Sequence, residues 1–218
     1  PLSVQEWRQW CAVELEHGED AATVLKMAIS HFNDCQLWSS YLQFHREVLG
    51  QSDMRSEFER AIEHVGMDFD EGHMIWEIYI QYEEEMGDEK SVASLKSRFS
   101  RVPLRANING ADEEVRRLSE SIAREYSKLS DTNSVLEHIR TRAKGFSIAR
   151  VRSLFEKLIC SDPDREDVWI SYVQYMKDLS SVLPIYDRAI YWHPTSITLL
   201  SGRLRAMEKF KSSLNDIR

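Results

Sequence analysis

Arginine and lysine side chains gather between residues 140 and 157, where their types and spacing favour a binding chemistry. The cluster consists of Arg140, Arg142, Lys144, Arg150, Arg152 and Lys157. Glu156 is the only acidic residue within this stretch. Because the guanidinium group is a planar fork that matches carboxylate and phosphate oxygens, the cluster predicts a contact with an acidic protein partner or with RNA. Solvated helix faces are the alternative interpretation.

Patterns typical of catalysis are missing from the sequence. The seven histidines form no His-x-x-x-His pair, and no glycine-rich phosphate loop or Gly-x-Ser-x-Gly elbow occurs. We therefore predict a non-enzymatic protein with no metal, no cofactor and no small-molecule ligand. Cys11, Cys35 and Cys160 are far apart, which fits reduced thiols inside a cell. No apolar run approaches the ~20 residues that a membrane span needs, so no membrane partner is expected.

Charge is divided unevenly along the chain. Residues 1–103 hold 20 acidic and 9 basic side chains, a net charge of −11, and residues 104–218 hold 16 and 19, a net charge of +3. The acidic half should repel nucleic acid, whereas the second half could touch it. The carboxylates of residues 83–89 indicate a solvated helix end or an acidic docking face.

The elements that must position these residues are helices, because only 8 glycines and 5 prolines punctuate the chain. One signature places a tryptophan, an aromatic residue and a further apolar residue at offsets 0, +3 and +6, on one side of a helix. A second signature is an aromatic residue or leucine followed by Ala-Ile or a similar pair. Together they are carried by Trp7, Trp38, Tyr41, Phe58, Trp76, Tyr79, Phe155, Trp169, Tyr172 and Tyr186. Their helical spacing favours a core role over a base-stacking role.

The clearest sequence signals for helix starts lie in the first part of the chain. Ser3 and Glu6 predict a helix capping box, and the helix that follows places Trp10 and Val13 on the apolar stripe. Asp53 is a candidate N-cap for a later helix. We also expect Glu14 and Glu83 to accept hydrogen bonds between helices.

Residues 104–145 depart from the pattern. Asn107 to Gly110 is expected to be a loop. Ala111 to Leu129 is expected to be a long helix with Leu118 on its apolar stripe, and residues 135–144 a shorter basic helix. His31 and His64 are placed at helix ends, where a cation is favoured.

The pattern returns in the last third of the chain. Pro184 is expected in the first turn of its helix, where a missing amide costs little. A final helix from Leu199 to Phe210 places Leu200, Arg203 and Met207 at the signature positions.

The spacing of the signatures predicts a repeat. Trp7 and Trp38 are 31 residues apart, Trp38 and Trp76 are 38 apart, and Trp169 and Leu200 are 31 apart. These intervals lie around the ~34 residues of a two-helix repeat. We therefore predict an all-α fold, a right-handed superhelical solenoid of antiparallel helix pairs. It forms a single domain over residues 1–218, with about six repeats and an irregular part at 104–145.

At this point the residues resemble a known family. Trp-x-x-Tyr-x-x-aromatic-Glu followed by Phe-Glu-Arg-Ala-Ile resembles the HAT (half-a-TPR) repeat, which implies an RNA-processing scaffold. Residues 58–88, 154–178 and 186–209 are most similar to the family of the squamous cell carcinoma antigen recognised by T cells, the U4/U6 snRNP recycling factors. Between 104 and 150 the sequence departs from that family and lacks the expected Trp/Tyr pairs.

The resemblance implies a nuclear protein–protein interaction scaffold in pre-mRNA splicing, acting in U4/U6 snRNP assembly or recycling. Its partners would be proteins of the splicing machinery or their regulators, and the family forms homodimers. RNA would be met only indirectly or weakly through this region. Two alternatives stay open: direct RNA binding by the basic second half, and a HAT scaffold of another complex, such as the U1 snRNP or the 3′-end cleavage machinery.

Overall fold

The computed structural model is helical throughout the part of the chain that it describes. That part consists of residues 1–18, 20–49, 54–110, 112–129, 131–142, 145–176 and 179–215. No β-strand occurs within these ranges. The predicted all-α fold is therefore confirmed.

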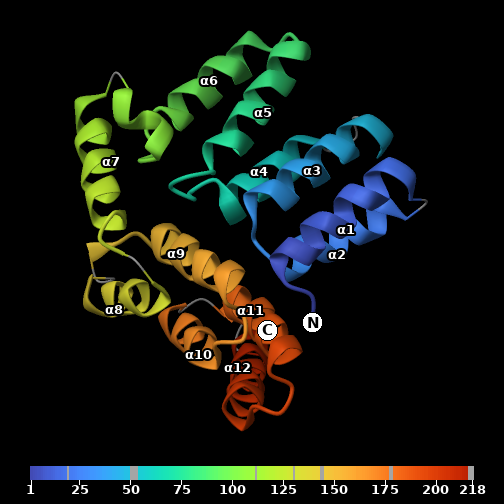
Figure 1. Cartoon of the computed structure of the whole chain (residues 1–218), viewed down its shortest axis with the longest axis vertical. Helices are drawn as coiled ribbons and strands as arrows, with labels where there is room; N and C mark the ends of the chain where they lie inside the picture. Colours follow the sequence, from blue (N-terminus) through green and yellow to red (C-terminus); the bar gives the residue numbers. More distant parts are fainter. Residues whose placement is uncertain are drawn as a thin grey trace.

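The first six α-helices form a stack that we call the N-terminal arm (Figure 1). It contains α1 (Val4–His17), α2 (Ala21–His31), α3 (Cys35–Phe44), α4 (Met54–Val65), α5 (His73–Glu85) and α6 (Glu89–Phe99). A π-helical turn, η1 (His45–Leu49), extends α3. Each helix packs on the next one, and the first helices of successive pairs also pack on each other, as α1 does on α3 and α3 on α5. This is the arrangement of a helical solenoid.

The irregular part of the sequence connects two stacks. It contains a 3₁₀ helix, η2 (Arg105–Asn109), followed by α7 (Glu113–Tyr126) and α8 (Thr132–Arg142). The loop expected at Asn107 to Gly110 is thus largely a helical turn. It is held because the Asn107 side chain donates to the carbonyls of Phe99 and Val102, both at 2.8 Å.

The remaining helices form the C-terminal arm. They are α9 (Ile148–Ser161), α10 (Glu166–Tyr175), α11 (Leu179–Trp192) and α12 (Ile197–Asn215). Helix α9 packs against both α8 and α10, and α11 packs against both α10 and α12. The helix-pair repeat therefore resumes after the connecting segment.

Local sequence explains where several helices begin. Ser3 and Glu6 form the predicted capping box at α1, with the Ser3 amide donating to Glu6 at 2.7 Å. Asp34, Asp88 and Asp112 accept backbone amides at the starts of α3, α6 and α7. The predicted N-cap Asp53 lies outside the described residues. Gly87 has a φ of 71° after α5, a conformation that favours glycine at a helix end.

Stacked rings explain why the two aromatic signatures recur. Phe58 of α4 stacks on Tyr79 of α5 with ring centroids 4.6 Å apart. Phe155 of α9 stacks on Tyr172 of α10 in the same way, at 4.9 Å. The second helix of one pair thus covers the first helix of the following pair. Nine of the ten signature residues are buried, and Tyr186 is half-buried.

Small side chains lie where second helices approach their neighbours. Ala28, Ala61 and Ala189, each in the second signature, have no exposed surface. An alanine methyl lets two helices come close, while the large rings fill the grooves beside it.

Two predictions about α1 and α7 are wrong in detail. Trp10 and Val13 are exposed, at 38% and 60%. In α5 and α10 the ring of the preceding second helix covers the equivalent residues, and no such helix precedes α1 among the described residues. Leu118 of α7 is also exposed, and α7 spans Glu113–Tyr126, shorter than the range predicted at 111–129.

The register of α12 also differs from the prediction. Leu199 and Ala206 are buried, whereas Leu200 is exposed. A Cβ at Gly202 would lie 2.6 Å from the Tyr186 hydroxyl, so only glycine permits this approach to α11. The helix therefore turns the side with Leu199, Gly202 and Ala206 toward α11.

Helix α11 begins earlier than predicted. Since it starts at Leu179, Pro184 lies inside the helix rather than in its first turn. The helix continues through this position even though proline has no amide hydrogen to donate.

The two arms fold onto each other (Figure 1). Arg188 Nε of α11 donates to the His31 carbonyl at the end of α2, at 2.8 Å. The rings of His31 and Tyr191 lie 4.4 Å apart, and those of Phe32 and Trp192 lie 5.9 Å apart. We call this contact of α2 and α4 with α9 and α11 the seam. It makes the solenoid more closed than a simple arc of repeats.

Among the described residues, none of the helices has both the length and the apolar character of a membrane-spanning segment. In the same ranges, His, Cys, Asp and Glu side chains form no group of three that could hold a metal ion.

Candidate interaction site

The structure divides the predicted basic cluster among different surroundings. Arg140 and Arg142 lie exposed at the end of α8. Lys144 lies outside the described residues. The other three residues, Arg150, Arg152 and Lys157, lie on α9 and contact three different elements. The cluster is therefore not one continuous cationic patch.

Glu125 of α7 neutralises one part of the cluster. Its carboxylate lies 3.1 Å from Arg150, 3.5 Å from Arg142 and 3.5 Å from His138. The Arg150 guanidinium also lies over the Phe146 ring, 4.2 Å from its centroid. The sequence analysis missed Glu125 because the α7–α8 turn separates it from the basic residues.

Arg152 and Lys157 reach across the seam. Arg152 lies 3.8 Å from Glu63 of α4. Lys157 forms an ion pair with Asp70, which also binds Arg105 at 2.8 Å. Burial raises the pKa of Asp70, but these two cations outweigh it and hold the pKa below its ordinary value. Both basic residues thus help to hold the arms together.

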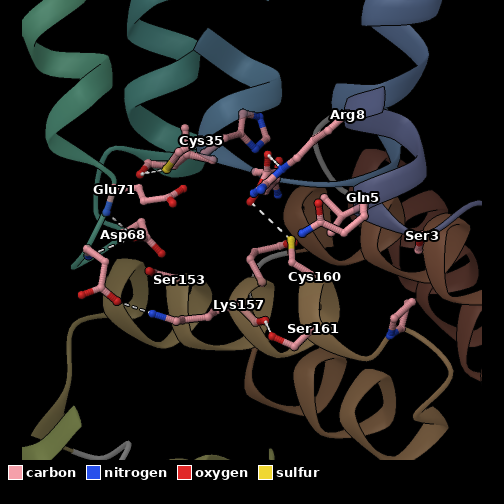
Figure 2. A pocket seen from close by; sticks show the side chains of 18 residues that line it. Ser3, Gln5, Arg8, Cys35, Asp68, Glu71, Ser153, Lys157, Cys160 and Ser161 are labelled. Carbon is pink, nitrogen blue, oxygen red and sulfur yellow. Dashed lines mark hydrogen bonds and ion pairs between the residues drawn. The ribbon is translucent and has the colours of Figure 1, made fainter. Parts of the chain in front are cut away.

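A cavity of about 420 Å³ opens where α1, α3 and the α4–α5 loop meet α9. Figure 2 shows Arg8 and Gln5 reaching from α1, and Lys157 and Cys160 reaching from α9, into this space. Arg8 forms a two-pronged ion pair with Asp34, with one hydrogen bond of 3.0 Å. The two cations of the cavity lining, Arg8 and Lys157, are thus paired with two of its five carboxylates, Asp34 and Asp70.

A buried ion pair lies in the seam behind this cavity. Glu156 of α9 accepts from both terminal nitrogens of Arg188, at 2.8 and 2.7 Å, and from the Tyr172 hydroxyl at 2.8 Å. Burial raises the pKa of Glu156, but the Arg188 guanidinium and these hydrogen bonds more than offset that effect and lower it. Glu156 is thus the acceptor of a buried pair rather than a counter-charge within an exposed cluster.

The N-terminal arm contains an ion pair of the same kind. Glu83 is fully buried and accepts two hydrogen bonds from Arg55 of α4, both at 2.7 Å. Its predicted role as an acceptor between helices is confirmed. The prediction for Glu14 is wrong, because Glu14 accepts from Trp10 of its own helix at 3.0 Å.

Two histidines at helix ends differ from expectation. Burial lowers the pKa of His31 and His64 below the ordinary value, and nearby arginines add to the effect. Both rings are therefore neutral at pH 7, although a helix end favours a cation. They act as packing groups, with His31 stacked on Trp7 and His64 on Trp38.

The three thiols are held in the protonated form. Burial raises the pKa of Cys11 to about 11 and raises those of Cys35 and Cys160 further. At pH 8 a pKa near 11 leaves about 100-fold less thiolate than the ordinary thiol pKa of 9.

We expect Ellman's reagent at pH 8 to modify all three cysteines at least about 100-fold more slowly in the folded protein than in guanidinium chloride. The time course of thionitrobenzoate release measures this difference. Raising the pH to 9.5 should accelerate the folded-state reaction in proportion to the thiolate. A thiol that reacts in the folded protein within tenfold of the unfolded rate would contradict the assignment.

Comparison with known proteins adds independent information. The family model described as PRP39 N-terminal HAT repeat matches residues 1–113. The human protein named "Spliceosome associated factor 3, U4/U6 recycling protein" is 25% identical over 96% of this chain and 26% of its own length. The mouse protein of that name is 26% identical with the same coverage. The Xenopus laevis "Pre-mRNA-processing factor 39" is 30% identical over 47% of this chain and 17% of its own length. The chain thus spans about a quarter of the length of the first two relatives.

Proposed function

The chain belongs to the family of the PRP39 N-terminal HAT repeat, and we propose that it is a non-enzymatic protein-interaction scaffold in pre-mRNA splicing. The resemblance to HAT-repeat RNA-processing proteins seen in the sequence is confirmed by this match. The names of the relatives, a spliceosome-associated factor and a pre-mRNA-processing factor, support the splicing context.

The observation that carries the proposal is how the aromatic signatures are used. The rings of Trp38, Trp76 and Trp169 are buried between packed helices. They do not face outward, where bases could stack on them. What the array offers to partners is a rigid surface of paired helices. Such a surface binds without the cost of ordering its own elements.

More specific roles follow from the human relative, whose name refers to U4/U6 recycling. We propose that the chain acts in the nucleus, contacts proteins of the splicing machinery in U4/U6 snRNP assembly or recycling, and forms a homodimer. A HAT scaffold of the U1 snRNP or of the 3′-end cleavage machinery is the alternative.

Direct RNA binding is the second candidate function. Arg140 and Arg142 are exposed at the end of α8 and could contact phosphates. The ion pairs of Arg142, Arg150 and Lys157 with carboxylates argue against a continuous phosphate track. If RNA were the main ligand, its affinity would fall steeply with salt.

Affinity capture from nuclear extract, with and without nuclease and read by mass spectrometry, tests the proposal. We expect spliceosomal proteins whose recovery survives nuclease. Recovery that disappears with nuclease would favour RNA contacts. Recovery without splicing components would overturn the functional assignment and leave the fold unaffected.

Charge reversal tests the exposed part of the basic cluster. We expect Arg140→Glu with Arg142→Glu to reduce capture of one partner at least about tenfold, because two exposed cations that could meet acidic groups are reversed. The far-ultraviolet circular dichroism spectrum should stay unchanged. Arg117→Glu is the matched control, because Arg117 is also an exposed arginine but lies on α7.

Arg150 of the same cluster is left unchanged in this test. Its side chain is 15% exposed and already faces Glu125, so a glutamate there would destabilise the fold. Equal capture of every protein by the double variant and the control would remove the binding role of Arg140 and Arg142.

A further inference from the structure

A groove of about 690 Å³ lies on the side of the seam opposite α1. The second helices of both arms line it, α2 and α4 on one side and α9 and α11 on the other. We call it the inter-arm groove. It brings Lys26, Trp38, Arg60 and Arg152 together, although they are far apart in the sequence.

Trp38 carries a polar atom without a partner in this groove. In later pairs the indole N–H of the signature tryptophan donates to a carbonyl of the preceding loop, from Trp76 to Gly66 at 3.0 Å and from Trp169 to Pro163 at 2.8 Å. Trp38 is 2% exposed, and its Nε1 has no such partner. Trp7 of the first pair shares this state but does not line the groove. A buried donor without an acceptor destabilises a protein, and this distinguishes the groove-lining Trp38 from Trp76 and Trp169.

Cations from three helices surround the same space. Arg60 lies over the Trp38 ring, 5.1 Å from its centroid, and is paired with Glu57 on its own helix. Arg152 is 3.8 Å from Glu63, whose side chain is 71% exposed. Lys26 is exposed and forms no ion pair with the residues that the structure describes. Lys26 is therefore directly available to a partner's carboxylate, to which the two arginines can add charge-assisted hydrogen bonds.

The balance of charge in the groove differs from that of the whole chain. Four cations line it, Lys26, Arg60, Arg152 and Arg188, against three carboxylates, Glu57, Glu63 and Glu156. The local balance is thus +1 in a chain whose net charge is −8. Since Glu156 and Arg188 neutralise each other, Lys26, Arg60 and Arg152 remain against Glu57 and Glu63.

We propose that the inter-arm groove binds an acidic segment of a protein partner, with a glutamate or aspartate carboxylate between Lys26, Arg60 and Arg152. The carboxylate forms charge-assisted hydrogen bonds with the guanidinium groups, and the Trp38 ring beneath Arg60 reports on its binding. This inference rests on the proposed scaffold function and names the site and the partner chemistry for it.

Peptide fits the groove better than nucleic acid does. A phosphate backbone carries a charge at every nucleotide and would meet Glu57 and Glu63 at the mouth. A peptide can place one carboxylate among the cations and neutral residues beside the two glutamates. Pro184 and Ile185 of α11 provide apolar contact for those neutral residues.

Indole N–H resonances in ¹⁵N–¹H spectra of the full chain report on the groove. The six tryptophans give six signals, and Trp38→Phe assigns one of them. The probe is a capped hexapeptide of alternating glutamate and glycine, with the glutamine version as control. We expect the Trp38 signal to shift with the glutamate peptide, and those of Trp76 and Trp169 to stay in place.

Lys26→Gln with Arg152→Gln should weaken that binding at least tenfold, and Arg117→Gln should leave it unchanged. An unmoved Trp38 signal at millimolar peptide, equal shifts with the glutamine peptide, or unchanged affinity in the double variant would each overturn the proposal. A hexauridine oligonucleotide that shifts Trp38 where the peptide does not would assign the groove to RNA instead. Loss of groove binding leaves the capture of splicing proteins as a separate result, so the two proposals fail independently.

Discussion

Replacing Arg188 by methionine is expected to lower the free energy of unfolding by about 3–5 kcal/mol at pH 7, the usual cost of removing one partner of a buried ion pair. The change leaves the buried Glu156 carboxylate with only its hydrogen bond from Tyr172 among the contacts described above. It also removes the hydrogen bond from Arg188 to the His31 carbonyl, which joins the two arms.

The loss should depend on pH in a defined direction. In the native protein the pKa of Glu156 is lowered below 4.5, so the pair stabilises the fold above pH 4.5 and this contribution fades as the pH falls through the lowered pKa. Without Arg188, burial is opposed only by the hydrogen bonds from Tyr172 and Asn33, so we expect the pKa of Glu156 to rise above its ordinary value. The variant therefore loses stability as the pH rises above 4.5, and its deficit against the native protein is larger at pH 7 than at pH 4.5.

Urea unfolding followed by circular dichroism at both pH values measures the deficit. Arg203→Met is the matched control, because Arg203 pairs with Asp187 at the surface and such pairs contribute about 0–1 kcal/mol. Adding Glu156→Gln to Arg188→Met should restore more than half of the loss at pH 7. Equal effects of the two single variants, or a deficit independent of pH, would contradict the buried-pair account.

Whether a contact could be predicted from the sequence depends on how far apart along the chain its residues lie. The burial of Trp38, Phe58 and Tyr79 followed from helical spacing, because periodic apolar residues must face a neighbouring helix. The repeat interval then fixed which helices are neighbours, and therefore the solenoid. These predictions need only residues within one or two pairs.

The seam was not predictable in this way. Arg188 and His31 are 157 residues apart, and Lys157 and Asp70 are 87 apart. Small rotations between successive helix pairs, summed over the array, decide whether such residues meet. A basic residue that pairs across the seam has the same sequence pattern as one on a solvated face. For this reason, Arg152 and Lys157 were grouped with the exposed Arg140.

The same limit explains the errors at the two ends of the array. Trp10 of α1 has the signature position of Tyr41, at +3, but it remains exposed because no second helix precedes α1 among the described residues. In α12 the close approach at Gly202 decides the register, and Leu200 lies outside it. Trp7 of α1 is only 4% exposed, so the signature predicts burial at its +3 position only where a preceding second helix covers it.

Trp169→Ala is expected to lower the free energy of unfolding by about 3–5 kcal/mol, whereas Trp10→Ala should cost less than about 1 kcal/mol. Trp169 has no exposed surface, donates to the Pro163 carbonyl and lies under the Arg188 guanidinium, 5.4 Å from its ring centroid. Its removal opens a cavity and withdraws a ring from the ion pair of the seam. Trp10 has the same side chain in the same signature, but its indole N–H meets only Glu14 at the surface.

Urea unfolding of the two alanine variants, followed by far-ultraviolet circular dichroism, compares one residue type in two surroundings. Trp169→Phe keeps the ring but removes the N–H donor, so it should lie between the native protein and Trp169→Ala and remain measurable if the alanine variant does not fold. Equal losses at positions 10 and 169 would mean that the signature tryptophans contribute alike whatever covers them. A larger loss at position 169 means that the next helix pair, rather than the signature itself, supplies the stability, since stacked neighbours stabilise each repeat of such an array.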